Sequence, residues 1–212
     1  MDAPLDWIRT GLELAGVFFF ATSGSLLAAR RGFDLVASLI LASLVGLGGG
    51  VLRDMVISQG APSAFTSPIY LLPPVLAAGL VYFHVPRLSR LERVLVTCDA
   101  AGLALFSIVG TLAALDAGMN AVTATILGAL SAVGGGVIRD VVANEVPQMF
   151  LPEGLYAVTA LVGAAATTVL VSSGRFGLGA GLAVAALVFG LRMASIRHGW
   201  RAPHASAHAP VR

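Results

Sequence analysis

The chain has 212 residues, of which 57% are hydrophobic and 11% are charged, and its mean hydropathy is +0.89. Because soluble domains carry roughly 25% charged residues, this composition argues against a soluble globular protein and favours one embedded in lipid. The 13 basic residues are all arginines scattered among apolar segments, a pattern that does not indicate nucleic-acid binding. The single cysteine excludes a disulfide within the chain.

Seven apolar segments approach the length of about 20 residues that a helix needs to cross a bilayer. In chain order they are 12–29, 34–58, 69–86, 94–115, 119–144, 154–173 and 177–194. We therefore expect an all-α integral membrane protein with a single transmembrane domain over 1–195. Residues 196–212 are rich in His, Ala and Pro, and we expect them to form a disordered cytoplasmic tail rather than a metal site of His198, His204 and His208.

The arginines predict the orientation of the chain. If there are seven spans, the loops after the first and third spans and the C-terminus lie on one side of the membrane. That side holds nine arginines, namely Arg30, Arg31, Arg87, Arg90, Arg93, Arg192, Arg197, Arg201 and Arg212, and the other side holds Arg9 and Arg175. The positive-inside rule then places the C-terminus in the cytoplasm and the N-terminus outside.

A seven-residue segment occurs twice. Residues 48–54 read Gly-Gly-Gly-Val-Leu-Arg-Asp, and residues 134–140, 86 positions later, read Gly-Gly-Gly-Val-Ile-Arg-Asp. The same offset pairs Gly16 with Gly102, Phe20 with Phe106 and Glu13 with Asp99. Each copy contains three spans, 12–86 and 94–173. An odd number of spans inverts the second copy, so we expect a pseudo-two-fold axis in the membrane plane, with 177–194 outside the symmetry.

Three consecutive glycines are unusual inside a helix, because each costs about 1 kcal/mol relative to alanine. The two runs are Gly48, Gly49, Gly50 and Gly134, Gly135, Gly136. One interpretation is that they let two helix backbones approach closely. The other is that they break the helices, so that unpaired carbonyls face a cation pathway. We favour the break, since inverted symmetry brings both runs to the midplane.

Ionised side chains at this depth cost several kcal/mol unless they are paired or hydrated. Arg53 and Asp54 follow one glycine run, and Arg139 and Asp140 follow the other. Neighbouring residues on a helix point about 100° apart, so we do not expect either arginine to be neutralised simply by the aspartate beside it.

Depth in the membrane indicates other partners for the arginines. Glu13 lies near the outer end of the first span, as Arg53 does near the end of the second, and Asp99 matches Arg139 at the inner side. We therefore predict Glu13–Arg53 and Asp99–Arg139 ion pairs, which form an outer and an inner ring around the pathway. The alternative is that these pairs only hold helices together.

These features resemble the bacterial members of the trimeric intracellular cation (TRIC) channel family. The resemblance rests on the two inverted repeats, each with a Gly-Gly-Gly-x-x-Arg-Asp run followed by Pro-x-x-Phe, at Pro62–Phe65 and Pro147–Phe150. It implies a homotrimer in the bacterial inner (plasma) membrane, with a potassium pore, or one for sodium, inside each protomer and without a cofactor. That pore would run through the second and fifth spans, kinked at their glycines. The implied pathway residues are Gly48, Gly49, Gly50, Arg53, Asp54, Gly134, Gly135, Gly136, Arg139 and Asp140, supported by Glu13 and Asp99.

Four functional classes compete. A monovalent cation channel fits the glycine runs and the resemblance. A secondary transporter of a small zwitterion such as glycine fits the inverted repeats equally well, because Arg next to Asp can hold a carboxylate and an ammonium group. An intramembrane enzyme is disfavoured, since the sequence has no His-Glu-x-x-His and no Gly-x-Ser-Gly. A purely structural scaffold is disfavoured by the charges within the spans. The lipid bilayer is the expected partner in each case.

Overall fold

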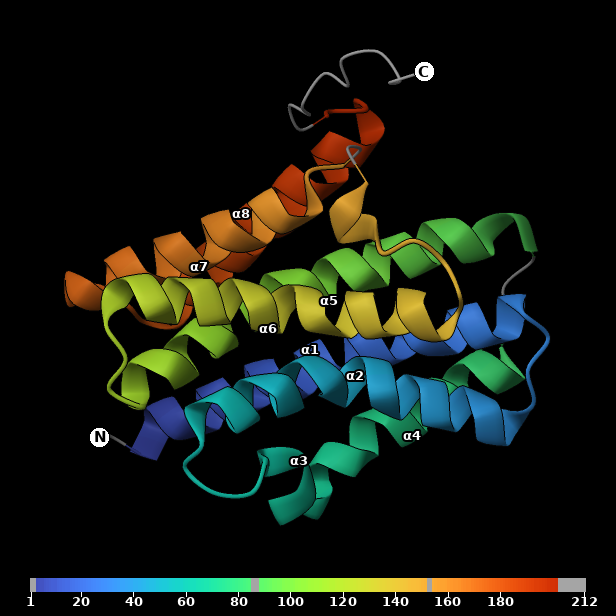
Figure 1. The fold of residues 1–212 in the computed structure, drawn as a ribbon, viewed down its shortest axis with the longest axis horizontal. Helices are drawn as coiled ribbons and strands as arrows, with labels where there is room; N and C mark the ends of the chain where they lie inside the picture. Colours follow the sequence, from blue (N-terminus) through green and yellow to red (C-terminus); the bar gives the residue numbers. More distant parts are fainter. Residues whose placement is uncertain (1–2, 85–87, 152–153, 202–212) are drawn as a thin grey trace, which may run out of the picture.

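The computed structural model describes residues 3–84, 88–151 and 154–201. These residues form helices joined by short connections (Figure 1). In chain order the helices are α1 (Ala3–Arg30), α2 (Leu35–Ile57), α3 (Ser63–Thr66), η1 (Pro68–Leu71), α4 (Leu72–Phe83), α5 (Leu88–Asp116), α6 (Ala121–Val142), η2 (Gln148–Phe150), α7 (Tyr156–Ser172) and α8 (Leu178–Arg197).

Each expected span falls on a helix. Five helices are long and apolar enough to cross a membrane, namely α1, α2, α5, α6 and α8. The third span of each repeat is shorter. In the first repeat η1 and α4 together form it (Pro68–Phe83), and in the second repeat α7 forms it. The last helix continues to Arg197, so residues 196 and 197 are helical rather than part of the expected tail, and residues 202–212 lie outside the described residues.

The connection between the first two helices of each repeat is built in the same way. Asp34 and Asn120, which are related by the 86-residue offset, occupy the N-cap positions of α2 and α6, and each side chain accepts a backbone N–H bond from the first turn. Two residues earlier, Gly32 and Gly118 adopt φ values of +71° and +81°, which glycine tolerates best. The repeat therefore extends to the caps and turns.

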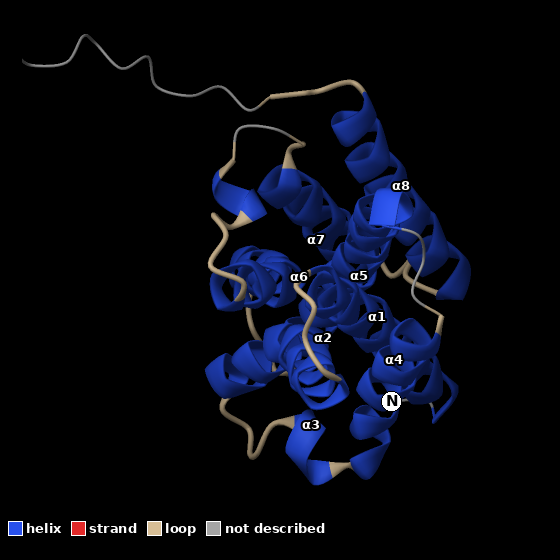
Figure 2. Ribbon diagram, turned by 90° about the vertical axis from the view of Figure 1, so that its right-hand side faces the viewer, coloured by secondary structure: helices blue, strands red, loops and turns tan. Residues whose placement is uncertain are grey.

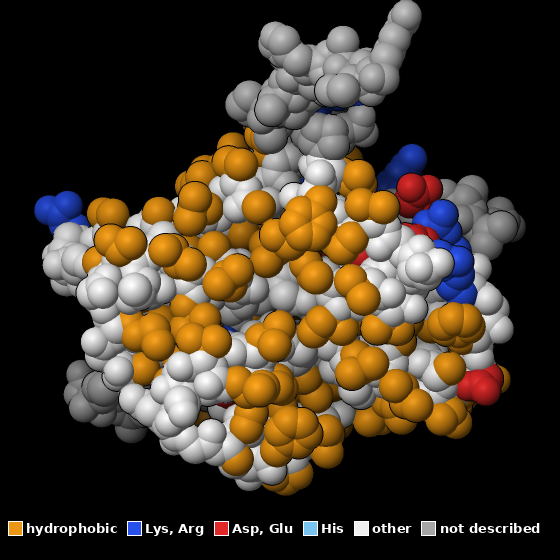
Figure 3. Space-filling view, in the orientation of Figure 1, with side chains coloured by type: hydrophobic (Ala, Val, Ile, Leu, Met, Phe, Trp, Pro, Cys, Tyr) orange, Lys and Arg blue, Asp and Glu red, His pale blue; other side chains and the backbone are white. Residues whose placement is uncertain are grey.

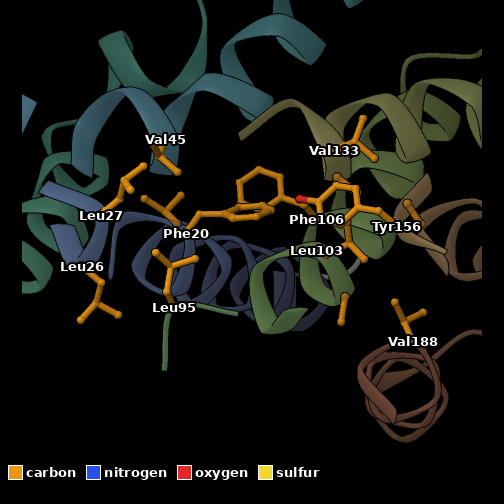
Figure 4. Close-up of a cluster of buried hydrophobic side chains, with 14 of the residues drawn as sticks. Phe20, Leu26, Leu27, Val45, Leu95, Leu103, Phe106, Val133, Tyr156 and Val188 are labelled. Carbon is orange, nitrogen blue, oxygen red and sulfur yellow. The ribbon is translucent and has the colours of Figure 1, made fainter. Parts of the chain in front are cut away.

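The helices α1 and α5 pack against each other at the centre, and α2 and α6 cover them on one side (Figures 1 and 2). Phe20 of α1 and Phe106 of α5 meet with ring centroids 5.4 Å apart (Figure 4). Each ring also lies against a glycine of the opposite repeat: Phe20 against Gly102, and Phe106 against Gly16. The two glycines are themselves related by the 86-residue offset. The pseudo-two-fold axis therefore passes between the two phenylalanines.

The middle glycines lie where α2 and α6 contact each other. A Cβ on Gly135 would lie 2.6 Å from the carbonyl oxygen of Val45, and a Cβ on Gly49 would collide with the carbonyl oxygen of Ser131. Val45 and Ser131 are again 86 residues apart, so each contact is the image of the other. These backbones can approach so closely only because neither glycine carries a side chain.

We expected the glycine runs to break the helices, and this expectation is wrong. α2 and α6 continue as α-helix through Gly48–Gly50 and Gly134–Gly136. Tight packing of one helix on the other offsets the low helix propensity of the glycines. The close-approach interpretation is the one that the structure shows. One backbone carbonyl still has an additional partner, since Ser131 Oγ donates to the oxygen of Gly49 at 3.3 Å.

The outside of the molecule is apolar. Figure 3 shows hydrophobic side chains across the middle of one face, with charged side chains toward the two ends of its long axis. Exposed apolar residues on α2 and α6 include Leu44, Met55, Val56, Ile126, Leu130 and Val141. A surface of this kind is suited to lipid rather than to water.

Replacing Gly135 with alanine is expected to lower the melting temperature of the protein purified in detergent. The new methyl group meets a carbonyl oxygen of α2 that cannot turn away, and overpacking of this kind costs about 1–3 kcal/mol. Gly79→Ala in α4 is the matched control, because a Cβ there meets nothing within 4 Å. Equal melting temperatures for the two variants would contradict the close contact of α2 with α6.

Candidate functional site

The first repeat holds a buried cluster of four polar side chains around Arg53. We call it the first charge cluster; it consists of Glu13 of α1, Arg53 and Asp54 of α2, and Tyr70 of η1. Arg53 Nη2 lies 2.7 Å from Glu13 Oε1 and 2.7 Å from Asp54 Oδ1. Tyr70 donates its hydroxyl hydrogen to Glu13 Oε2 at 2.9 Å. Arg53 is only 2% exposed, so these carboxylates replace the water that it has lost.

The second repeat holds the corresponding cluster around Arg139. The second charge cluster consists of Asp99 of α5, Arg139 and Asp140 of α6, and Tyr156 of α7. Arg139 Nη1 lies 2.6 Å from Asp99 Oδ1, and Nη2 lies 2.8 Å from Asp140 Oδ1. The hydroxyl of Tyr156 donates to Asp99 Oδ1 at 3.3 Å. Every member of one cluster has its partner in the other 86 positions away.

The two ion pairs predicted from depth in the membrane, Glu13–Arg53 and Asp99–Arg139, are both present. The expectation that neither arginine pairs with the aspartate beside it is wrong. Arg53 Nε donates to Asp54 Oδ1 at 2.8 Å, and Arg139 Nε donates to Asp140 Oδ1 at 2.9 Å. The 100° between neighbouring Cβ atoms does not separate the ends of long side chains. The arginine folds back, and its guanidinium then bridges two carboxylates.

Each cluster therefore carries one positive and two negative formal charges. The net charge of −1 is buried between helices, where the weak screening lets it act strongly on a nearby ion. A site of this sign attracts cations and repels anions. Among the described residues, no group of three or more His, Cys, Asp or Glu side chains is arranged to hold a metal ion.

The second oxygen of each aspartate fixes the segment that follows its helix. Asp54 Oδ2 accepts a hydrogen bond from the backbone N–H of Ser63, and Asp140 Oδ2 accepts one from the N–H of Gln148, both at 2.9 Å. These segments begin at Pro62 and Pro147, which occupy the N-cap positions of α3 and η2. The Pro-x-x-Phe runs thus lead the chain from each aspartate to the tyrosine of the same cluster.

Two members of the clusters were missed from the sequence. Tyr70 and Tyr156 begin or precede the third span of each repeat, and their hydroxyls contact the carboxylates of the first spans. The sequence did contain a sign of their role, because the 86-residue offset, extended past the Pro-x-x-Phe runs, pairs Tyr70 with Tyr156. It was one match in a region where the alignment had already slipped by one residue.

The third glycine of each run faces its charge cluster. A Cβ on Gly50 would lie 3.5 Å from the Phe106 ring and 3.8 Å from both Arg53 Nη2 and Glu13 Oε1. A Cβ on Gly136 would collide with the hydroxyl of Tyr156 and lie 3.3 Å from Asp99 Oδ1. The run of three glycines therefore serves two purposes, helix contact in the middle and room for the polar groups at the end.

A cavity of 410 Å³, which we call the vestibule, opens beside the first charge cluster. Its walls come from α1, α2, α5, the segment that leads into α3, and η1. They comprise Arg9, Thr10, Glu13, Arg53, Asp54, Ile57, Gln59, Gly60, Ala61, Ser63, Tyr70, Ala113, Asp116 and Ala117. At its edge Arg9 forms an ion pair with Asp116. The vestibule makes the first charge cluster reachable from one end of the molecule.

A smaller cavity adjoins the vestibule and also reaches Phe106. Its volume is 10 Å³, about one water position, and it shares Glu13, Arg53 and Tyr70 with the vestibule. Its inner walls are apolar and include Gly50 and Phe106. A line from the vestibule past the first charge cluster therefore leads toward the phenylalanine pair at the pseudo-two-fold axis.

Comparison with known proteins identifies this architecture. The family model described as glycine transporter matches twice, at residues 10–86 and 96–172, which are the two repeats. A UPF0126 membrane protein of Deinococcus radiodurans is 43% identical over 160 residues, which cover 75% of this chain and 74% of that protein. The UPF0126 inner membrane protein YadS of Escherichia coli is 35% identical over 72% of this chain and 73% of its own length.

The structure is also similar to solved channels. The TRIC trimeric intracellular cation channel orthologue from Rhodobacter sphaeroides superposes with a TM-score of 0.84 at 32% identity, covering 90% of this chain and 98% of that one. A TRIC channel from C. elegans matches with a TM-score of 0.59 at 11% identity, which shows the shared fold. The chain therefore belongs to the glycine transporter family and is a bacterial member of the TRIC channel family.

Proposed function

We propose that this protein is a channel for monovalent cations, potassium before sodium, with one pathway inside each protomer of a homotrimer. The observation that carries the proposal is the pair of buried charge clusters, each with two carboxylates and one arginine, on opposite sides of one pseudo-two-fold axis. The likeness to solved TRIC cation channels supports the same function.

The proposed pathway runs from the vestibule past the first charge cluster and the Phe20–Phe106 pair to the second charge cluster. α2 and α6 flank it and meet at Gly49 and Gly135. A cation that enters the vestibule meets Glu13 and Asp54 in its wall, and these carboxylates give this end its negative charge. At the other end the four corresponding residues carry the same formal charge, and Arg192 lies beside them over the ring of Tyr156.

The arginines tune the strength of each site. A cluster of two bare carboxylates would bind a cation tightly and release it slowly, whereas conduction needs binding that is weak enough to reverse. In each cluster the guanidinium and the tyrosine hydroxyl already occupy carboxylate oxygens, as Arg53 and Tyr70 do at Glu13. The remaining charge of −1 suits passage of a monovalent ion better than capture of a divalent one.

The proposed membrane placement rests on the distribution of the arginines. We propose seven spans, with the vestibule outside and the C-terminus in the cytoplasm of a bacterial inner membrane. α7 has 17 residues and α4 has 12, which is short for a bilayer core of about 30 Å. The η1 segment is continuous with α4 and extends that span to Pro68–Phe83. Two of the arginines behind the predicted orientation, Arg87 and Arg212, lie outside the described residues.

Transport of a small zwitterion such as glycine is the second candidate. The matching family model carries that description, and the vestibule presents both signs of charge. Arg9 or Arg53 would receive the carboxylate of such a molecule, and Asp116 or Glu13 its ammonium group. This mechanism needs a site that saturates and alternates between sides, whereas a channel needs neither.

Potassium flux from liposomes separates the two candidates. Vesicles that contain the purified protein and a potassium gradient are treated with a protonophore, and the same preparation is tested for uptake of labelled glycine. We expect rapid potassium flux that rises in proportion to the gradient, without saturable glycine uptake. Saturable glycine uptake without potassium flux would show that the protein is a transporter and not a channel.

Glu13→Gln is expected to reduce potassium flux about tenfold. The amide keeps the shape and one acceptor for Tyr70 but removes the net negative charge of the first charge cluster, and 1.4 kcal/mol of lost attraction corresponds to a factor of ten. Glu92→Gln is the control, because Glu92 lies exposed on α5. If both variants conduct like the unchanged protein while eluting normally on gel filtration, Glu13 does not act on the permeant ion.

A further inference from the structure

The two halves of the molecule have nearly the same charge cluster but different surroundings. The side chain of Glu13 is 7% exposed and that of Asp54 15%, whereas those of Asp99 and Asp140 are 1% and 5% exposed. The first charge cluster faces the vestibule, whereas each side chain of the second is at most about 5% exposed among the described residues. Because the cluster residues correspond one to one, the difference must come from the residues around them.

The 86-residue offset identifies the apolar part of that difference. Ala113 lines the vestibule, and the residue that corresponds to it in the first repeat is Leu27. Arg9 also lines the vestibule, and it corresponds to Leu95. Both leucines belong to the buried core, with 2% and 6% exposure (Figure 4). Two leucines thus fill the space that an alanine and a solvated arginine leave open at the other end.

An ion pair covers the same place from outside. The vestibule residues Ala117 and Gln59 correspond to Arg31 and Glu145. Arg31 Nη2 lies 2.6 Å from Glu145 Oε1 and donates to the carbonyl oxygen of Ala143 at 3.0 Å. The pair joins the connection after α1 to the end of α6. Its side chains are 42% and 38% exposed, so water can reach it and the bond can exchange readily.

The seventh span adds a third contact that has no counterpart in the first repeat. Arg192 of α8 donates to the carbonyl oxygen of Gly154 and, at 2.7 Å, to Gln148 Oε1. Its guanidinium also lies over the ring of Tyr156, 4.7 Å from the centroid. These contacts hold the segment after α6 against the second charge cluster, where a methyl group on Gly136 would already collide with Tyr156.

We propose that these residues form a closed gate at the second-cluster end of the pathway, and that the structure is open to the vestibule and shut at the gate. Leu27 and Leu95 exclude water, and the Arg31–Glu145 pair and Arg192 hold the covering segment in place. The inference rests on the proposed channel function for its meaning, but the closure itself is a property of the packing. Separation of α1 from the end of α6 would open the gate.

The gate is tested by charge reversal. Arg31→Glu places two carboxylates opposite each other, so we expect the closed state to lose population and potassium flux to rise about fivefold. The double variant Arg31→Glu, Glu145→Arg restores the pair with its charges exchanged and should return the flux to the original level. Leu27→Ala, which copies Ala113, should also raise the flux, whereas Leu26→Ala removes an equally buried neighbouring leucine and should not.

A second readout does not depend on conduction. Ala143 is 8% exposed at the gate, and the chain has a single cysteine, Cys98. In a Cys98→Ser background, Ala143→Cys should react slowly with a charged thiol reagent and several times faster once Arg31→Glu is added. Faster labelling without potassium flux in any variant would retain the gate and refute the channel. If the unchanged protein conducts potassium, and if neither Arg31→Glu nor Leu27→Ala changes the flux or the labelling rate, there is no gate at this place.

Discussion

Arg53 and Arg139 can stay ionised inside a bilayer only if other groups replace the water that they have lost, and the rest of this structure depends on that constraint. Arg53 and Arg139 are each 2% exposed or less, and each is held by a carboxylate from the first helix of its repeat and by the aspartate that follows it. The same carboxylates leave each cluster with a net negative charge. The requirement that stabilises the fold thus also produces the electrostatics of a cation pathway.

Bringing two such clusters to one axis requires helices that nearly touch. α2 and α6 meet at Gly49 and Gly135, where any side chain would strike the opposite backbone. The glycines that follow leave room for Glu13 and Tyr156 beside their arginines. A run of three glycines is costly in an isolated helix, and here that cost is offset by packing and by the site that it makes room for.

Much of this arrangement could be predicted from the sequence because the repeat is long and its motif is doubled. The helices, the inverted relation and the Glu13–Arg53 and Asp99–Arg139 pairs followed from the 86-residue offset and from depth in the membrane. The errors came from effects that act at the level of side chains and packing. Helix propensity alone suggested broken helices, and the angle between Cβ atoms concealed the contact of each arginine with the aspartate beside it.

Other features depend on residues that only the folded chain brings together. Arg31 is 114 positions from Glu145, and nothing in its local sequence indicates that partner. Arg192 acts from a helix outside the repeat, so symmetry could not predict its contact with Gln148. The asymmetry between the open vestibule and the buried second cluster is nonetheless encoded at corresponding positions, such as Ala113 and Leu27. This asymmetry can be recognised in the sequence only after the structure has shown which positions line the cavity.

The central claim, that two buried clusters of net negative charge form one cation pathway, is tested most directly by its ion selectivity. Single-channel currents would be recorded in a planar bilayer across a tenfold gradient of potassium chloride. The account predicts a reversal potential with the sign of the potassium equilibrium potential, approaching about 59 mV in magnitude for a purely cation-selective pathway. Reversal near zero, or toward the chloride equilibrium potential, would contradict it.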